Sequence, residues 1–196
     1  MSSRDHILEV IRKNQPKGLP LQEIAFSDGE PFDKISKFTT VLESIGGTVI
    51  PINEWGEVEA YLNQRFSTEK RWVNLVPELR NLAPLADFTE DPHLLENVMV
   101  AILPGHFGVA ENGAVWITEE LMGDRALPFI CEHLALIIRA ENIFPTLHDA
   151  YTHIDKSQYG FGTYIAGPSK TADIEQSLVL GAHGPKSLML FLITET

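Results

Sequence analysis

DKISKFTTVLESIGGTVIPINEWGEVEAYLNQRFSTEKRWVNLV, residues 33–76, contains two helix-to-strand units in a row. Its first part places apolar side chains at helical spacing and stops at a pair of glycines, which predicts a helix followed by a turn. The apolar strand TVIPI (48–52), a second helix EVEAYLNQRF (57–66) and a second strand RWVNLV (71–76) follow. Helices and strands that alternate over short connections are typical of a mainly parallel sheet covered by helices.

The rest of the chain continues this alternation. It predicts the α/β fold class, with a mainly parallel, open sheet flanked by helices on both faces. Residues 114–118 also predict a strand, and residues 124–138 combine a helix with an apolar run that could end as a buried strand. Residues 1–30 are expected to form a short N-terminal helical segment, and residues 31–196 the α/β domain. The strands expected in the mainly parallel sheet lie near residues 48–52, 72–76, 98–103, 163–166 and 188–193.

The charge of the chain argues against two classes of partner. Its 27 acidic residues outnumber its 15 basic ones, which gives a formal net charge of -12 at pH 7. Such a surface repels phosphate backbones, so nucleic acid and anionic membrane surfaces are not expected partners. No apolar run approaches the ~18 residues of a membrane-spanning helix, and the N-terminus does not resemble a signal peptide. We therefore predict no membrane span and a cytoplasmic location.

Neither the cysteine nor the histidines of the chain predict a metal site. One cysteine, Cys131, cannot form an intrachain disulfide and leaves no Cys-x-x-Cys pair for zinc or an iron–sulfur cluster. His148 and His153 are five residues apart, which does not align them on one face of a helix as a metal site requires. We predict no metal site and no cofactor on this chain.

The segment GPSKTADIEQSLVLGAHGP, residues 167–185, is the richest in candidate binding residues. We interpret it as a turn after a strand, at Gly167, followed by a helix that starts near Ser169. Unpaired N–H groups at a helix start favour an anion, and Ser169, Thr171 and the ammonium of Lys170 would complete its binding site. The same residues also suit simple helix capping, and that alternative stays open.

Charged residues farther along the segment are candidates for direct contact with a ligand. Asp173 and Glu175 are two residues apart, so they cannot share one face of the predicted helix, and Asp173 is the better candidate for the ligand edge. His183 lies between two glycines in a loop, where a carboxylate could pair with it. Lys186 adds positive charge that an acidic protein otherwise lacks in this segment. Each of these residues also has a purely structural interpretation.

Three stretches resemble the LutC/YkgG family of lactate-utilization proteins, which carry the LUD domain. AGPSKTADIEQSLVLGAHGPKSL (166–188) looks like the closing signature of that family, with Gly-Pro-Ser-basic-Thr-Ala-Asp-Ile-Glu followed by Gly-x-His-Gly-Pro-basic-x-Leu. GVAENGAVWI (108–117) is similar to the family's Ala-Glu-Thr-Gly-Thr segment. ALPFICEHLALIIRAENIFPTLHDA (126–150) is similar to its middle. The resemblance is strong over about residues 95–193.

The chain departs from the family pattern at three positions. Lys170 stands where arginine is commoner, which keeps the charge but loses the bidentate geometry of a guanidinium. Asn112 and Ala114 stand where the family often has threonine, so a hydroxyl contact is missing there. Asn112 and the preceding Glu111 are nonetheless candidates for contact with a ligand.

The resemblance implies a fold of the NagB/RpiA/CoA-transferase-like group and a part in the oxidation of L-lactate to pyruvate. It implies partner proteins of the LutA and LutB type, which carry the iron–sulfur clusters, and a small anionic or nucleotide-like ligand on this chain. The ligand-binding candidates are Glu111, Asn112, Gly167, Ser169, Lys170, Thr171, Asp173, Glu175, His183 and Lys186, and the catalytic candidates among them are Glu111, Asp173 and His183.

Two other functions stay open. In CoA-transferase-like folds a glutamate acts as nucleophile, so one alternative is a stand-alone isomerase or acyl/CoA-type transferase that uses Glu111 and the 167–186 loop. The other alternative is a non-catalytic interaction subunit.

Overall fold

The chain divides into two compact units, Met1–Pro31 and Phe32–Thr196. No helix in the described ranges is long and apolar enough to cross a membrane. The computed structural model describes residues 2–16, 18, 32–66, 70–86, 92–154, 159–172 and 178–194.

The N-terminal unit contains the helix α1 (Ser3–Lys13). Ser2 and Asp5 cap its start reciprocally: the Ser2 hydroxyl accepts from the Asp5 N–H at 3.3 Å, and the Asp5 carboxylate accepts from the Ser2 N–H at 2.9 Å. None of its residues is buried. The helix therefore owes its start to local hydrogen bonds.

Five strands form the central sheet of the second unit, and every neighbouring pair is parallel. Its three inner strands are almost uninterrupted apolar runs, which suits strands that are buried on both faces. The predicted fold class, with a mainly parallel sheet, is confirmed. In spatial order the strands are β1 (Thr48–Ile52), β11 (Ser187–Ile193), β6 (His133–Arg139), β3 (Val98–Pro104) and β2 (Arg71–Asn74).

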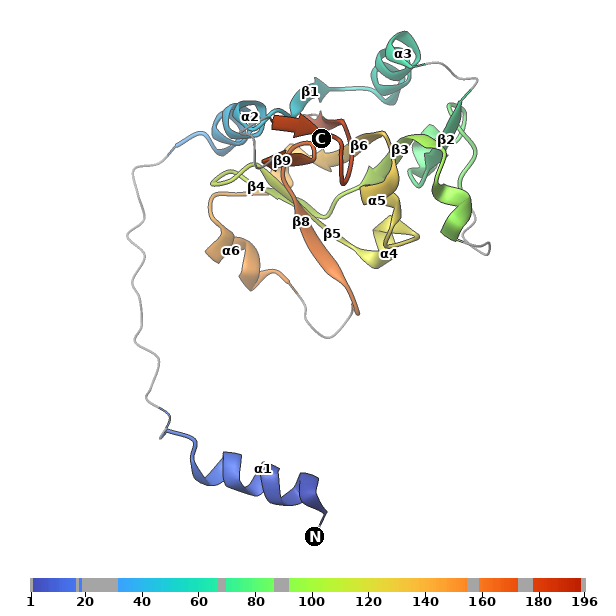
Figure 1. Ribbon diagram of the computed structural model, residues 1–196. Helices are drawn as coiled ribbons and strands as arrows, with labels where there is room; N and C mark the ends of the chain where they lie inside the picture. Colours follow the sequence, from blue (N-terminus) through green and yellow to red (C-terminus); the bar gives the residue numbers. More distant parts are fainter. Residues whose placement is uncertain are drawn as a thin grey trace. The chain divides into compact units, whose positions relative to one another are not determined.

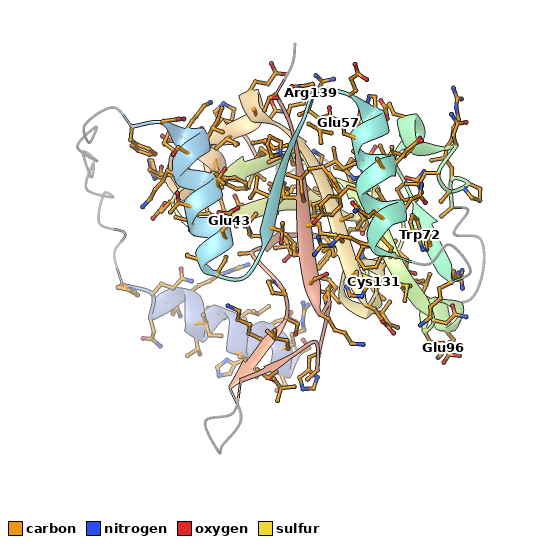
Figure 2. The ribbon with its side chains drawn as sticks, turned by 90° about the horizontal axis from the view of Figure 1, so that it is seen from above. Glu43, Glu57, Trp72, Glu96, Cys131 and Arg139 are labelled. Carbon is orange, nitrogen blue, oxygen red and sulfur yellow. The ribbon has the colours of Figure 1, made fainter. Side chains whose placement is uncertain are left out.

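One face of the central sheet is covered by α3 (Trp55–Arg65) and the 3-10 helix η1 (Pro77–Leu79). Val58 of α3 is fully buried against this face, where it shares a cluster with Phe191 of β11. Figure 2 shows α3 with the strands of the sheet beside it.

The other face is covered by α2 (Lys34–Ser44), by two short helices and by a second sheet. Phe38 of α2 is fully buried there, in a cluster with Leu190 of β11. Since Leu190 and Phe191 are adjacent in the strand and serve opposite faces, the expected covering of both faces is confirmed. The short elements of this unit are α4 (Glu119–Met122), α5 (Leu127–Ile130), η2 (Pro92–Leu95) and η3 (Ala140–Asn142).

The second sheet has four strands, in the order β7 (Ile143–Phe144), β4 (Phe107–Val109), β5 (Ala114–Thr118) and β8 (Gly162–Ile165). β5 runs antiparallel to both of its neighbours. The outer face of this sheet packs against α6 (Leu147–Thr152). The second sheet therefore lies between the central sheet and α6 (Figure 1).

The strand predicted near residues 163–166 exists as β8, but its assignment to the parallel sheet is wrong. β8 is the edge of the second sheet, where Ile165 lies opposite Val115 of β5. An inner position of the central sheet belongs instead to β6, which is buried along five consecutive residues, whereas all of β8 is only half-buried. An inner parallel strand needs apolar side chains on both faces, and only β6 has them.

The helix predicted to start near Ser169 is also wrong. The residues there form an antiparallel hairpin of β9 (Lys170–Ala172) and β10 (Leu178–Leu180). The β-branched residues Thr171 and Val179 lie opposite each other in this hairpin, and such side chains favour extended backbone. The pattern of capping residues misled the prediction, because the prediction ignored the strand preference at both ends of the segment.

Candidate functional site

The signature segment, residues 166–188, packs at the edge of the central sheet where the parallel strands begin. We call this edge the amino edge. The Ser169 N–H donates to the Pro185 carbonyl at 2.9 Å, and the Gly181 N–H donates to the Ser169 carbonyl at 3.1 Å. The Lys186 N–H donates to the carbonyl of Glu132, the residue before β6, at 2.8 Å. The structure thus brings Ser169 together with the loop 181–186.

Figure 2 shows the two edges of the central sheet. Cys131 and Glu96, which precede β6 and β3, lie toward one end, and Arg139 at the end of β6 lies toward the other. Ligands of open α/β sheets usually bind at the carboxyl ends of the strands. The signature segment of this chain lies at the opposite edge.

Gly167 allows the signature segment to approach the end of α2 closely. Its φ of +73° lies in the left-handed region, which favours glycine. A Cβ atom at this position would stand 3.0 Å from the carbonyl oxygen of Ile45, the residue that ends α2. A side chain is excluded here by both the backbone conformation and the available space.

Lys170 occupies a different environment from the one predicted. Its Nζ atom stands 3.4 Å from the position that a Cβ of Gly46 would take, just beyond the end of α2. The carboxyl end of a helix carries partial negative charge, so the ammonium is favoured at this place. Because no helix starts at Ser169, the expected anion-binding site of unpaired helix N–H groups beside Lys170 is not formed.

Glu111 and Asn112 belong to the turn between β4 and β5, and both make local structural hydrogen bonds. Asn112 Oδ1 accepts from the Ala114 N–H at 3.0 Å. Glu111 Oε2 accepts from the N–H of Leu147, the first residue of α6, at 2.8 Å. The carboxylate therefore caps α6 together with Thr146, whose hydroxyl accepts from a later N–H of the same helix.

Replacing Glu111 separates capping from catalysis. Glu111→Ala should lower the free energy of unfolding by about 1 kcal/mol, because the first N–H of α6 loses its acceptor. Glu111→Gln keeps an oxygen acceptor and should cost less than half of that. Chemical denaturation of both variants measures the difference. If Glu111→Ala leaves the stability unchanged, the capping account of this residue fails, and if Glu111→Gln abolishes a measured activity, the carboxylate has a catalytic role as well.

The other predicted site residues are distributed as follows. The Thr171 hydroxyl donates to the Val179 carbonyl at 3.3 Å, within the hairpin. His183 is exposed in the loop 181–186. Asp173 and Glu175 lie outside the residues that the structure describes.

The second signature lysine, Lys186, lies beside an open pocket of about 480 Å³ at the amino edge. Its Nζ atom is 3.4 Å from Oε2 of Glu132, which lines this pocket. The Arg71 guanidinium donates to Oδ1 of Asn97 at 3.3 Å across the same pocket. We call it the amino-edge pocket; its lining residues are Lys70, Arg71, Asn97, Met99 and Glu132.

His133, the first residue of β6, lies among these charges. Its Nδ1 is 2.7 Å from the hydroxyl of Ser187, the first residue of β11. Removal of water around the ring lowers the pKa of His133, the Glu132 carboxylate raises it, and Lys186 and Lys70 lower it further. Three cations, Lys70, Arg71 and Lys186, therefore gather around one carboxylate and a histidine that stays neutral near pH 7.

Five residues at or beside this pocket were not predicted from the sequence: Lys70, Arg71, Asn97, Glu132 and His133. They stand directly before or at the starts of the strands β2, β3 and β6. Because these neighbouring strands are parallel, they begin at the same edge of the sheet. The available signals were the consecutive cations Lys70 and Arg71 at the start of a strand, and the pair Glu132-His133 before an apolar run. Without the strand order, nothing indicated that these two places meet.

The lowered pKa values of two histidines predict how stability depends on pH. The pKa of His133 is lowered for the reasons given above. Removal of water also lowers the pKa of His106, although the Glu120 carboxylate raises it. The unfolded chain therefore binds more protons than the folded chain, so stability should be full above about pH 6.5 and fall as the pH drops below it. Denaturant titrations between pH 5 and 8 of the wild type and of the double variant His106→Gln/His133→Gln test this. Equal slopes for the two proteins would contradict it.

A model of the LUD domain family matches residues 4–193. Lactate utilization protein C of Bacillus pumilus (strain SAFR-032) is 27% identical over 112 residues, 54% of this chain and 47% of that protein. The uncharacterized protein YkgG of Escherichia coli (strain K12) is 29% identical over 106 residues, 51% of this chain and 46% of that protein. The chain thus spans about half the length of these curated relatives.

A solved structure has the same fold. A duf162 family protein from Deinococcus radiodurans matches with a TM-score of 0.61 and 14% identity, over 83% of this chain and 99% of that one. This likeness concerns the fold alone, whereas the family match covers nearly the whole sequence. The chain belongs to the LUD domain family, as a relative of the LutC and YkgG proteins.

Proposed function

We propose that this chain is a LutC-like subunit of a cytoplasmic system that oxidises L-lactate to pyruvate, and that it acts with iron–sulfur proteins of the LutA and LutB type. The names of relatives such as lactate utilization protein C support the lactate part of this proposal. The ligand that we assign to this chain is the carboxylate of lactate or pyruvate.

The observation that carries the ligand assignment is the amino-edge pocket. In a chain with a net charge of -12, three cations, Lys70, Arg71 and Lys186, lie at or beside the pocket that Glu132 lines. A substrate carboxylate held by these groups would gain hydrogen bonds to charged donors of about 1.5–3 kcal/mol each. The fork of Arg71 also matches a carboxylate in geometry.

We assign the transfer of the electrons to the partners. Oxidation of lactate to pyruvate releases two electrons and two protons. The one cysteine of this chain, Cys131, is 1% exposed, and burial raises the pKa of its thiol to about 12. A buried thiol of this kind is neither a cluster ligand nor a redox centre. We therefore assign substrate binding to this chain and electron transfer to its partners.

The test is lactate-dependent reduction of a dye by the three proteins produced together. Arg71→Ala/Lys186→Ala should raise the KM for L-lactate about tenfold or more, because two charge-assisted contacts are lost. Lys37→Ala, which removes an exposed cation of α2, is the matched control and should leave KM unchanged. The isolated chain should not reduce the dye with lactate.

Two outcomes would overturn this assignment in different ways. If the partners oxidise lactate equally well without this chain, the chain has no part in the reaction. If the chain is required but the double variant leaves KM unchanged, it acts as a non-catalytic interaction subunit. The transferase alternative loses support from the capping contact between Glu111 and the Leu147 N–H.

A further inference from the structure

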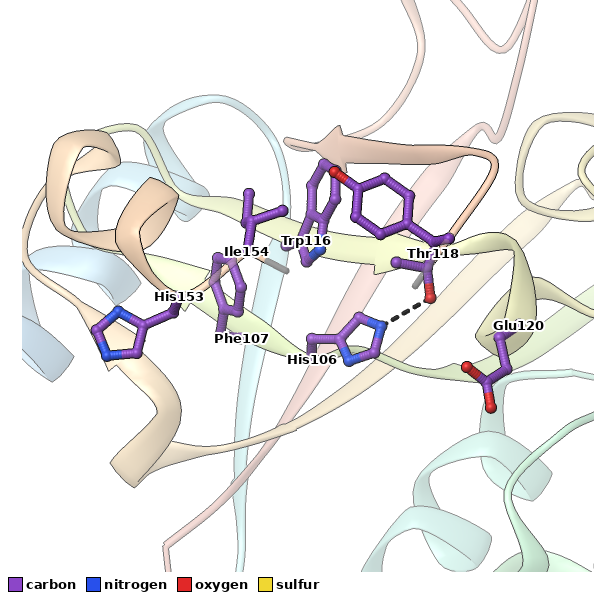
Figure 3. A pocket seen from close by; sticks show the side chains of 8 residues that line it. His106, Phe107, Trp116, Thr118, Glu120, His153 and Ile154 are labelled. Carbon is purple, nitrogen blue, oxygen red and sulfur yellow. Dashed lines mark hydrogen bonds between the residues drawn. The ribbon is translucent and has the colours of Figure 1, made fainter. Parts of the chain in front are cut away.

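A second pocket, which the sequence did not indicate, opens on the outer face of the second sheet (Figure 3). His106, two residues after the end of β3, lies at its polar end. This position is at the carboxyl ends of the central strands, where open α/β sheets usually bind ligands. We call it the His106 pocket; it has a volume of about 270 Å³ and is lined by His106, Phe107, Trp116, Thr118, Glu120, His153, Ile154 and Tyr159.

The polar end of the His106 pocket is built from β5 and its neighbours. His106 Nε2 is 2.8 Å from Oγ1 of Thr118, which is 5% exposed (Figure 3). Removal of water lowers the pKa of His106 even though Glu120 raises it, so the imidazole is neutral at pH 7. Glu120 thus supplies negative charge at this end of the pocket, among the lining residues that the structure describes.

The opposite wall is apolar and aromatic. The rings of Phe107 and Trp116 are stacked with centroids 6.4 Å apart, and Tyr159 meets Trp116 edge-on at 5.6 Å. Ile154 completes this wall. Aromatic faces attract cations, most strongly when a carboxylate lies nearby and the pocket restricts water.

We propose that the His106 pocket binds a small organic cation: an amine or amidine whose apolar body lies on the aromatic wall and whose charged end reaches Glu120. The polar end of the ligand donates to the carboxylate, and Thr118 fixes the orientation of His106 beside it. A carboxylate such as lactate is repelled, because its charge would face Glu120. This site is distinct from the amino-edge pocket and does not rest on the proposed lactate function.

Three ring compounds of equal shape test this assignment: benzamidine (a cation), benzamide (neutral) and benzoate (an anion). They are titrated into the ¹⁵N-labelled chain at physiological ionic strength, where charges more than ~8 Å apart are screened. Benzamidine should shift the indole resonance of Trp116 and the amides of Phe107 and Thr118. Benzamide should do so more weakly, and benzoate not at all.

Glu120→Gln should weaken the binding of benzamidine about threefold or more, as expected for one exposed ion pair. Glu43→Gln removes the same charge from the exposed surface of α2 and should leave the affinity unchanged. Equal shifts with benzoate and benzamidine would overturn the proposal. So would equal affinities of the wild type and Glu120→Gln, or no shift of these resonances with benzamidine.

Discussion

Replacing Phe191 with alanine is expected to lower the free energy of unfolding by about 3–5 kcal/mol. Phe191 is fully buried in β11, between β1 and β6, under α3. Its ring meets that of Tyr61 edge-on, with centroids 5.5 Å apart and an angle of 86°. The strands on both sides hold their spacing through hydrogen bonds, so the cavity left by the ring cannot collapse.

Chemical denaturation of the full chain measures this effect. Phe129→Ala is the matched control: Phe129 is 42% exposed, and its truncation should change the stability by no more than about 1 kcal/mol. A cost below that of Phe129→Ala would show that Phe191 does not lie in the centre of the packing.

Asn74→Asp is expected to cost about 3–5 kcal/mol at pH 7, although the two side chains have the same shape. Asn74 is fully buried at the end of β2. Its amide donates to the carbonyls of Val76 and Ala83 at 3.1 and 3.0 Å, and its Oδ1 accepts from the Val76 N–H at 2.8 Å. A carboxylate would keep the last contact but would place buried negative charge against two carbonyl oxygens.

The pH dependence of this variant identifies the cause. At low pH the introduced carboxyl binds a proton and regains one donor, so the difference from the wild type should shrink as the pH falls from 7 toward 4. Asn63→Asp, on the exposed surface of α3, is the control and should cost less than about 0.5 kcal/mol. Equal costs for the two variants would contradict the account of Asn74.

The sequence predicted the parallel sheet because its buried strands are recognisable one by one. The apolar runs of β3 and β11 are unmistakable, and the alternation from residue 33 to residue 76 predicts that a helix connects β1 to β2. The order of the strands was not predictable in this way. The sequence predicted a strand at β8 and an apolar run at β6, but not which of them lies in the central sheet; β6 is buried along five consecutive residues, whereas β8 is half-buried.

The candidate site was predicted only in part, because it also depends on the order of the strands. Lys186 and Ser169 belong to one segment, so their neighbourhood followed from the sequence. Arg71 and Glu132 are far apart along the chain and meet because β2, β3 and β6 are parallel neighbours. The hairpin of β9 and β10 shows a different limit: residues that suit a helix cap also occur beside extended backbone, and here Thr171 pairs with Val179 of the same segment.

The central claim is that the amino-edge pocket holds a substrate carboxylate, and titration of L-lactate into the ¹⁵N-labelled chain tests it most directly. The account predicts saturable shifts of the amides of Arg71, Asn97 and Glu132, which Arg71→Ala/Lys186→Ala abolishes and Lys37→Ala leaves in place. Shifts confined to residues around His106, or shifts at the amino edge that persist in the double variant, would contradict it.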